Sequence, residues 1–112
     1  KFRRNFIHIR DVVRAFIFSI ENFKKVRNNI FNLGLSSANI TKIQLAQKIK
    51  NNLKDTKIVV NRSKSDPDKR DYFVSNKKIE KAGFKAKIKL EEGIAELSNI
   101  FKNCDIKFNN NY

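Results

Sequence analysis

The apolar residues near the start of the chain predict a short strand that runs directly into a helix. Phe6, Ile7 and Ile9 are aromatic or β-branched and lie close together, which is typical of a strand. Asp11 stands just before a long apolar run, where a short acidic side chain is a favourable helix N-cap. A strand that ends at a capped helix is a common place for a polar ligand. We therefore expect a strand, a cap and a helix in this order.

The helix expected over residues 12–22 has almost no polar face. Val12, Phe16 and Ile20 form one apolar stripe, and further apolar residues lie beside it. Phe18 falls on the side that should face water. A helix that is apolar nearly all round is buried on several sides. It is either the central core helix of this domain or a surface covered by another domain.

The remaining pattern predicts a mixture of short strands and helices without an internal repeat. We expect Thr41 to cap one helix and Ser75 to cap another, with Gly83 as the left-handed residue that ends the second. Phe84 should then fold back on that helix end. The expected strands are 29–34, ended by Gly34, and 57–61, with a brief extended segment at 72–74; the expected helices are 42–53, 76–82 and 91–102. Residues 103–112 are Asn-rich and are expected to be a disordered tail.

The charge of the chain is strongly positive, with 25 Lys and Arg against 11 Asp and Glu and a net charge of +14. This balance favours an anionic partner. The Lys residues are spread along the whole chain, however, whereas a nucleic-acid interface needs them clustered on one face. A solvated basic surface is the preferred interpretation, and a small basic nucleic-acid-binding domain is the alternative. No apolar run is long enough to span a membrane, so no membrane partner is expected.

The residue types that carry catalysis do not form a complete set. His8 and Cys104 are the only residues of their kind, which excludes an internal disulfide and leaves too few ligands for a Cys/His metal site. The single Cys fits a reducing, cytoplasmic setting. Asp66, Asp68 and Asp71 share a loop with Lys and Arg, so ion pairing explains them better than a carboxylate pair. Neither G-x-G-x-x-G nor G-x-x-x-x-G-K-[ST] occurs.

Arginines, in contrast, stand at predicted strand ends and in loops. They are Arg4, Arg10, Arg62 and Arg70, and an aromatic residue, Phe6 or Tyr72, stands near two of them. A guanidinium can bind phosphate while a ring packs against a sugar or base. This combination of residues suits a nucleoside diphosphate.

Several short motifs follow one another along the chain: Arg4–Val12, Phe31–Gly34, Ile40–Ala46, Asp68–Tyr72, Ser75–Phe84 and Leu90–Ile94. Their order and spacing resemble those of the extended short-chain dehydrogenase/reductases, the NAD(P)-dependent sugar-nucleotide epimerases, dehydratases and reductases. Each motif is weak alone, but together they occur in the family order and at near-family spacing. The resemblance covers the chain to about Phe101 and implies an α/β protein, mixed α+β in this part. Residues 1–102 would be the small C-terminal substrate-binding segment of such an enzyme.

The resemblance also implies roles for particular residues. Arg4 would contact the diphosphate of a nucleotide-diphosphate sugar, with Phe6 beside it, Arg70 as the second phosphate contact and Asn32 at the nucleotide end of the site. His8, as a strand histidine, would be structural, like the Asp11 cap. Many relatives carry an arginine in an R-P-G-[DH] motif before the Arg-x-Tyr segment, and here the corresponding residues 64–68 have none.

The catalytic parts of the family are not in this sequence. The dinucleotide turn that binds NAD or NADP and the Tyr-x-x-x-Lys pair would belong to an N-terminal Rossmann domain upstream of residue 1. We therefore expect a piece of a longer, cytoplasmic polypeptide whose partner is its own Rossmann domain and which forms a homodimer when intact. Within this chain no catalytic, cofactor-binding or metal-binding residue is expected.

Overall fold

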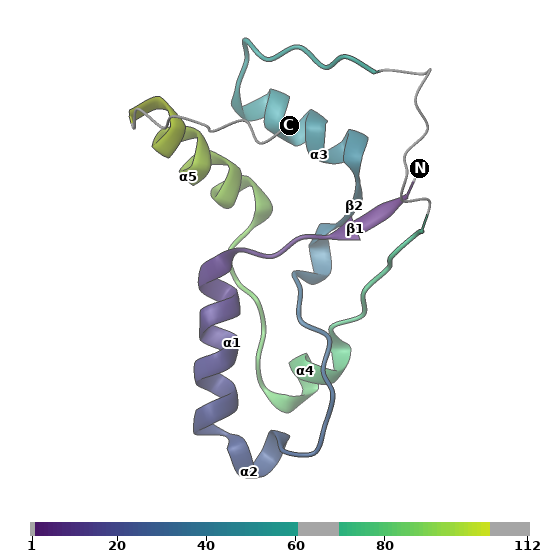
Figure 1. Cartoon of the computed structure of the whole chain (residues 1–112), viewed down its shortest axis with the longest axis vertical. Helices are drawn as coiled ribbons and strands as arrows, with labels where there is room; N and C mark the ends of the chain where they lie inside the picture. Colours follow the sequence, from purple (N-terminus) through teal and green to yellow (C-terminus); the bar gives the residue numbers. More distant parts are fainter. Residues whose placement is uncertain (1, 61–69, 104–112) are drawn as a thin grey trace, which may run out of the picture.

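The computed structural model describes residues 2–60 and 70–103 (Figure 1). Within these ranges the chain is mixed α and β, with a two-stranded sheet, five α-helices and one short 3-10 helix. The elements are β1 (Arg3–Asn5), α1 (Ile9–Glu21), α2 (Phe23–Val26), η1 (Ser36–Ala38), β2 (Asn39–Thr41), α3 (Lys42–Asn52), α4 (Lys77–Ala82) and α5 (Leu90–Asn103). The predictions for residues 61–69 and for residues 104–112 of the expected tail lie outside the described residues. The expected tail began at residue 103, which was wrong for this residue, because Asn103 is the last residue of α5.

The sheet is formed by β1 and β2, which pair antiparallel with Arg4 opposite Ile40. The strand predicted around residues 6–9 is therefore misplaced: β1 ends at Asn5, and Phe6 continues it only through hydrogen bonds to Ala38 and Leu35. The strands predicted at 29–34 and over the described residues 57–60 are wrong. A strand needs a neighbouring strand for its backbone hydrogen bonds. Neither segment pairs with another strand among the described residues.

The cap of α1 differs from the prediction. His8 is the N-cap, and its Nδ1 accepts a hydrogen bond of 3.1 Å from the Arg10 backbone N–H. Asp11 is instead inside the first turn and fully buried, and its Oδ2 accepts from the backbone N–H groups of Lys87 and Ile88 at 2.9 and 2.8 Å. The predictions that Asp11 is the cap and that His8 lies in a strand were thus both wrong. The Asp11 carboxylate does not cap the helix, because it binds backbone N–H groups that are distant in sequence.

One face of α1 packs on the first of two small apolar clusters. Ala15, Ile79 and Phe84 are buried there, with Phe18 packed against them. The Phe18 and Phe84 rings are 5.7 Å apart between centroids. The prediction that Phe18 faces water was therefore wrong, and the opposite side of α1, which carries Phe16, is the exposed one.

The other helix ends follow the local sequence with one exception. Thr41 caps α3 with the predicted hydrogen bond, which is part of a capping box with Gln44. Gly83 ends α4 at φ 111°, a conformation that favours glycine, and the Phe84 N–H returns to Ile79 as expected. The cap of α4 is Asn76, not Ser75.

The second apolar cluster adjoins the C-terminal end of β1. Leu35, Ala38 and Ala86 are buried in it, and partly buried residues that include Phe6 and Leu90 pack around them. In Figure 1 the sheet lies between the two groups of helices, with α1, α2 and α4 on one side and α3 and α5 on the other. The sheet therefore joins two small cores rather than covering one.

Candidate functional site

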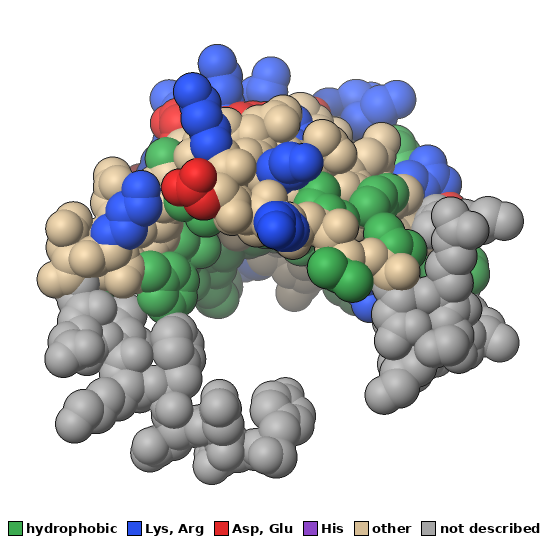
Figure 2. Space-filling model, turned by 90° about the horizontal axis from the view of Figure 1, so that it is seen from above, with side chains coloured by type: hydrophobic (Ala, Val, Ile, Leu, Met, Phe, Trp, Pro, Cys, Tyr) green, Lys and Arg blue, Asp and Glu red, His purple; other side chains and the backbone are tan. Residues whose placement is uncertain are grey.

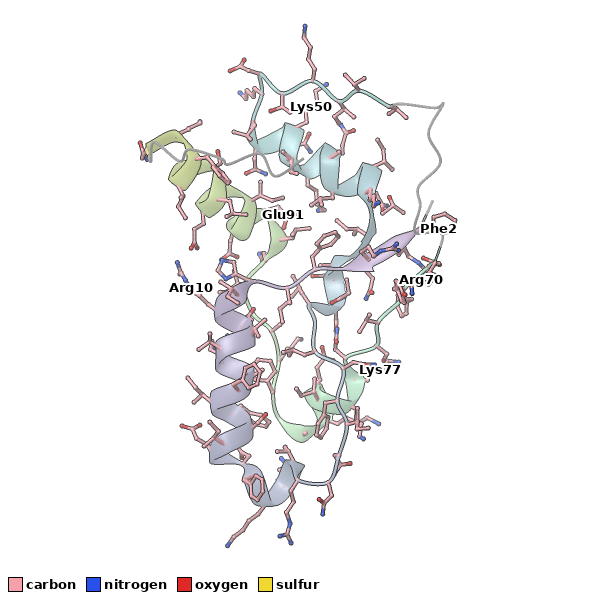
Figure 3. All side chains as sticks on the ribbon, viewed as in Figure 1. Phe2, Arg10, Lys50, Arg70, Lys77 and Glu91 are labelled. Carbon is pink, nitrogen blue, oxygen red and sulfur yellow. The ribbon has the colours of Figure 1, made fainter. Side chains whose placement is uncertain are left out.

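Two arginines that are distant in sequence meet at the start of β1. Arg4 comes from the strand itself, and Arg70 lies in the extended segment beside it (Figure 3). Their guanidinium carbons lie 5.0 Å and 5.5 Å from the centroid of the same Tyr72 ring. Arg4 Nη1 also donates to the backbone oxygen of Arg70. We call Arg4, Arg70 and Tyr72 the arginine cluster.

A second arginine–aromatic pair adjoins this cluster. The guanidinium carbon of Arg3 lies 5.0 Å from the centroid of the Phe73 ring, and the guanidinium donates hydrogen bonds to both carboxylate oxygens of Asp71. The hydrogen bonds from the Arg3 side chain and then from its backbone N–H lower the pKa of Asp71 from 3.8 to about 2. Asp71 is thus ion-paired, as expected, but with Arg3 across the fold rather than with a cation of its own loop.

The segment that carries Tyr72 is held against β1 by the backbone. The Tyr72 N–H donates to the Arg3 carbonyl at 3.2 Å. The Arg3 N–H in turn donates to Asp71 Oδ1 at 2.7 Å. These bonds place the side chains of residues 70–73 over the strand, and this is how two predicted arginines come together.

Two other predicted site residues lie outside the arginine cluster. Phe6 packs with the second apolar cluster at the far end of β1. Asn32 is exposed and donates to the Ser75 carbonyl at 3.5 Å. Their roles at a nucleotide stay predictions. Arg10 pairs with Glu96, and Arg62 lies outside the described residues.

Sequence reasoning missed Arg3 and the stack on Tyr72. The available pattern was the pair of adjacent arginines at 3 and 4 and the pair of adjacent aromatics at 72 and 73. In extended chains such neighbours point to opposite faces, so two matching pairs indicate two arginine–aromatic contacts. The pattern does not show that residues 70–73 lie beside β1, so the sequence alone does not pair either arginine with its ring.

An apolar pocket of about 530 Å³ opens between α3, α5 and residues 6–9. Its volume is in the usual range for ligand pockets. Phe6, Leu45, Ile49, Ile94 and Leu97 contribute much of its wall. The charged or titratable side chains on its lining are His8, Lys89 and Glu96.

His8 lies in the wall of this pocket and contacts both α1 and α5. Its Nδ1 accepts from the Arg10 backbone, and its Nε2 lies 3.3 Å from Glu96 Oε2. Gly93 leaves room for the ring, since a Cβ there would lie 3.1 Å from His8 Cδ2. Both ring nitrogens therefore have partners within the described residues, and these contacts fix the orientation of the ring.

Other functional classes were compared with the same structure. Over residues 2–60 and 70–103, no group of three His, Cys, Asp or Glu side chains could hold a metal ion. No helix of this part of the chain is long and apolar enough to cross a membrane. On the face seen in Figure 2, Lys and Arg side chains stand apart from one another rather than in one continuous stripe.

No protein-family model matches the chain.

Proposed function

We propose that the chain is the nucleotide-sugar-binding part of an NAD(P)-dependent sugar-nucleotide epimerase or dehydratase. One observation carries the proposal: Arg4 and Arg70, which are 66 positions apart, converge on one aromatic ring. The sequence motifs had assigned phosphate contacts to these same two arginines. Their convergence supports a common anionic ligand.

The chemistry of the cluster suits a diphosphate joined to a sugar and a base. A guanidinium donates two parallel hydrogen bonds to phosphate oxygens. The Tyr72 ring, 40% exposed, offers a flat apolar face and a hydroxyl group beside the two cations. Arg4 and Arg70 would hold the phosphates, and Tyr72 would pack against the adjoining sugar or base.

In this proposal the hydride transfer is carried out elsewhere in the polypeptide. A Rossmann domain upstream of residue 1 would bind NAD or NADP and supply the catalytic Tyr and Lys. The apolar pocket between α3 and α5 is a surface on which that domain could pack, because it is lined almost wholly by hydrophobic side chains. The intact enzyme would be a cytoplasmic homodimer.

Calorimetric titration of this chain with nucleoside-diphosphate sugars of different bases tests the proposal. We expect one base to be preferred, and we expect Arg4→Ala and Arg70→Ala each to weaken its binding. Loss of a charge-assisted hydrogen bond costs about 1.5–3 kcal/mol, which corresponds to about a 10- to 150-fold weaker Kd. Titration with NAD alone should give no binding.

The matched control is Arg27→Ala, which removes an exposed arginine at the end of α2 and should leave binding unchanged. Equal loss in all three variants would contradict a specific site. Tight binding of duplex DNA with a steep inverse dependence on salt would favour the nucleic-acid alternative. Binding of NAD by this chain would contradict the assignment of the cofactor to another domain.

A further inference from the structure

The outer face of α1 carries a regular apolar seam. Ile9, Val13, Phe16 and Ile20 are 68%, 51%, 67% and 76% exposed, with spacings of four, three and four residues. Phe23, which begins the separate helix α2, lies three residues after Ile20 and is also exposed. Alternating steps of four and three are the spacing with which one helix packs along another. We call these five residues the α1 seam.

From Val13 onward the seam faces away from the rest of the described chain, whereas Ile9 also lines the apolar pocket between α3 and α5. The opposite side of α1 carries Asp11, Ala15 and Phe18, which contact the protein's own core. In Figure 3 a row of α1 side chains projects outward from the ribbon, away from α4. Such a contiguous apolar surface marks a site of interaction.

A basic groove runs beside the seam. Its volume is about 350 Å³, and its lining includes Arg14, Lys85, Lys87 and the acid Glu21. Ile17, 49% exposed, also lines this groove. Ile17 lies four residues after Val13 and three before Ile20, so on the helix surface it adjoins both residues of the seam and connects the seam to the basic groove.

The charge around the groove is positive even after its own ion pairs are counted. Arg14 is bound to the buried Asp11, and Glu21 remains as the acid of the groove beside two lysines. Lys25 adds a further cation, since its Nζ lies 3.6 Å from where a Cβ of Gly83 would be. A partner that covers the seam would therefore bring its edge against a surplus of positive charge.

We propose that the α1 seam binds an amphipathic helix of a partner protein, with acidic residues along the edge that meets the basic groove. The spacing of the seam residues indicates that the partner contributes a helix. The positive charge of the groove indicates that the edge of this partner helix is acidic. A second copy of this chain fits less well, because each copy would place its own basic groove and a net charge of +14 against the other. This interaction is separate from nucleotide binding, and it does not depend on the proposed function.

Fluorescence anisotropy with labelled heptad-repeat peptides tests this proposal on the full chain. One probe has Leu at the seam positions and Glu on both flanks, and a second has the same Leu residues and Lys on the flanks. We expect the Glu peptide to bind and the Lys peptide to bind at least tenfold more weakly. The variants Phe16→Lys and Ile20→Lys should abolish binding of the Glu peptide, and K85E/K87E should weaken it at least tenfold.

The matched control is Ile30→Lys, because Ile30 is 88% exposed but lies off the seam. It should bind the Glu peptide like the unmodified chain, and circular dichroism of all variants checks that the fold is retained. Failure of the Glu peptide to bind would overturn the proposal, and so would equal binding of the two peptides. A dimer in sedimentation that Phe16→Lys dissociates would overturn it in favour of a second copy.

Discussion

Asp71 shows how a single residue joins two segments that are distant in sequence. Its carboxylate accepts hydrogen bonds from the side chain and backbone of Arg3, 68 positions away, and its pKa falls from 3.8 to about 2. A carboxyl whose pKa is lower in the folded state stabilises the fold above its unfolded pKa. This contribution is therefore present above about pH 4 and lost as the pH falls through about 2.

We predict that the Asp71 carboxyl titrates near pH 2 in the folded chain, which carbon-detected NMR can follow. The variant Arg3→Ala should return its pKa toward 3.8, because the main hydrogen-bond donor is gone. Arg10→Ala removes a cation that pairs with Glu96 instead, and should leave Asp71 unchanged. A midpoint that stays near pH 2 in Arg3→Ala would contradict this account.

At the residue scale, local patterns located arginines but not their partners. The sequence predicted phosphate contacts for Arg4, at a strand end, and for Arg70, in a loop. The structure brings these two arginines together. The exchange of roles between His8 and Asp11 could not be foreseen. It depends on two backbone N–H groups at positions 87 and 88, and no local spacing reports a contact across that distance.

Asp11 also acts at the scale of elements, because it joins α1 to the segment between α4 and α5. Replacing it with Ala would leave the backbone N–H groups of Lys87 and Ile88, and the Arg14 guanidinium, without their acceptor. A buried donor without a partner costs about 1–3 kcal/mol. We predict that Asp11→Ala lowers the free energy of unfolding by at least about 2 kcal/mol in urea denaturation.

The control for this prediction is Glu21→Ala, which removes an exposed acid from the same helix. It should change the free energy of unfolding by less than about 0.5 kcal/mol. Asp11→Asn keeps one acceptor oxygen and should fall between the two. If Asp11→Ala were as stable as Glu21→Ala, the tether between α1 and residues 87–88 would not be a stabilising contact.

The helices were predicted better than the strands for a physical reason. Helix hydrogen bonds join residues four positions apart, so nearby residues determine both the periodicity and caps such as Thr41 and Gly83. Strand bonds depend on a neighbour from elsewhere in the chain. The apolar segment at 57–60 is not a strand here, whereas β2 contains a single apolar residue, Ile40, and pairs with β1.

The whole molecule is more open than its length suggests. Its radius of gyration is 16.9 Å, whereas a compact domain of this length has about 13 Å. With 40% hydrophobic residues, the sequence contains enough apolar side chains for one core. The described residues build two small clusters instead and leave many large apolar side chains exposed. Composition counts apolar residues, and it carries no information on how they divide between clusters.

The apolar pocket between α3 and α5 leaves hydrophobic surface exposed in the folded chain, and this can be tested with a dye. A dye such as ANS binds exposed apolar surface, and we predict that it binds the native chain without denaturant. Leu97 and Ile100 line the pocket and are 55% and 41% exposed, so Leu97→Gln and Ile100→Gln should lower the dye fluorescence without a loss of helix content.

Ile30→Gln is the control for this prediction, since Ile30 is exposed but lies away from the pocket. Its fluorescence should equal that of the unmodified chain. Equal fluorescence in all variants would show that the dye binds elsewhere. Extending the chain with an upstream Rossmann domain should abolish the part of the signal that depends on Leu97, because burial of the pocket would exclude the dye. A signal that persists in the extended protein would contradict packing of that domain on this pocket, while the phosphate role of Arg4 and Arg70 would be unaffected.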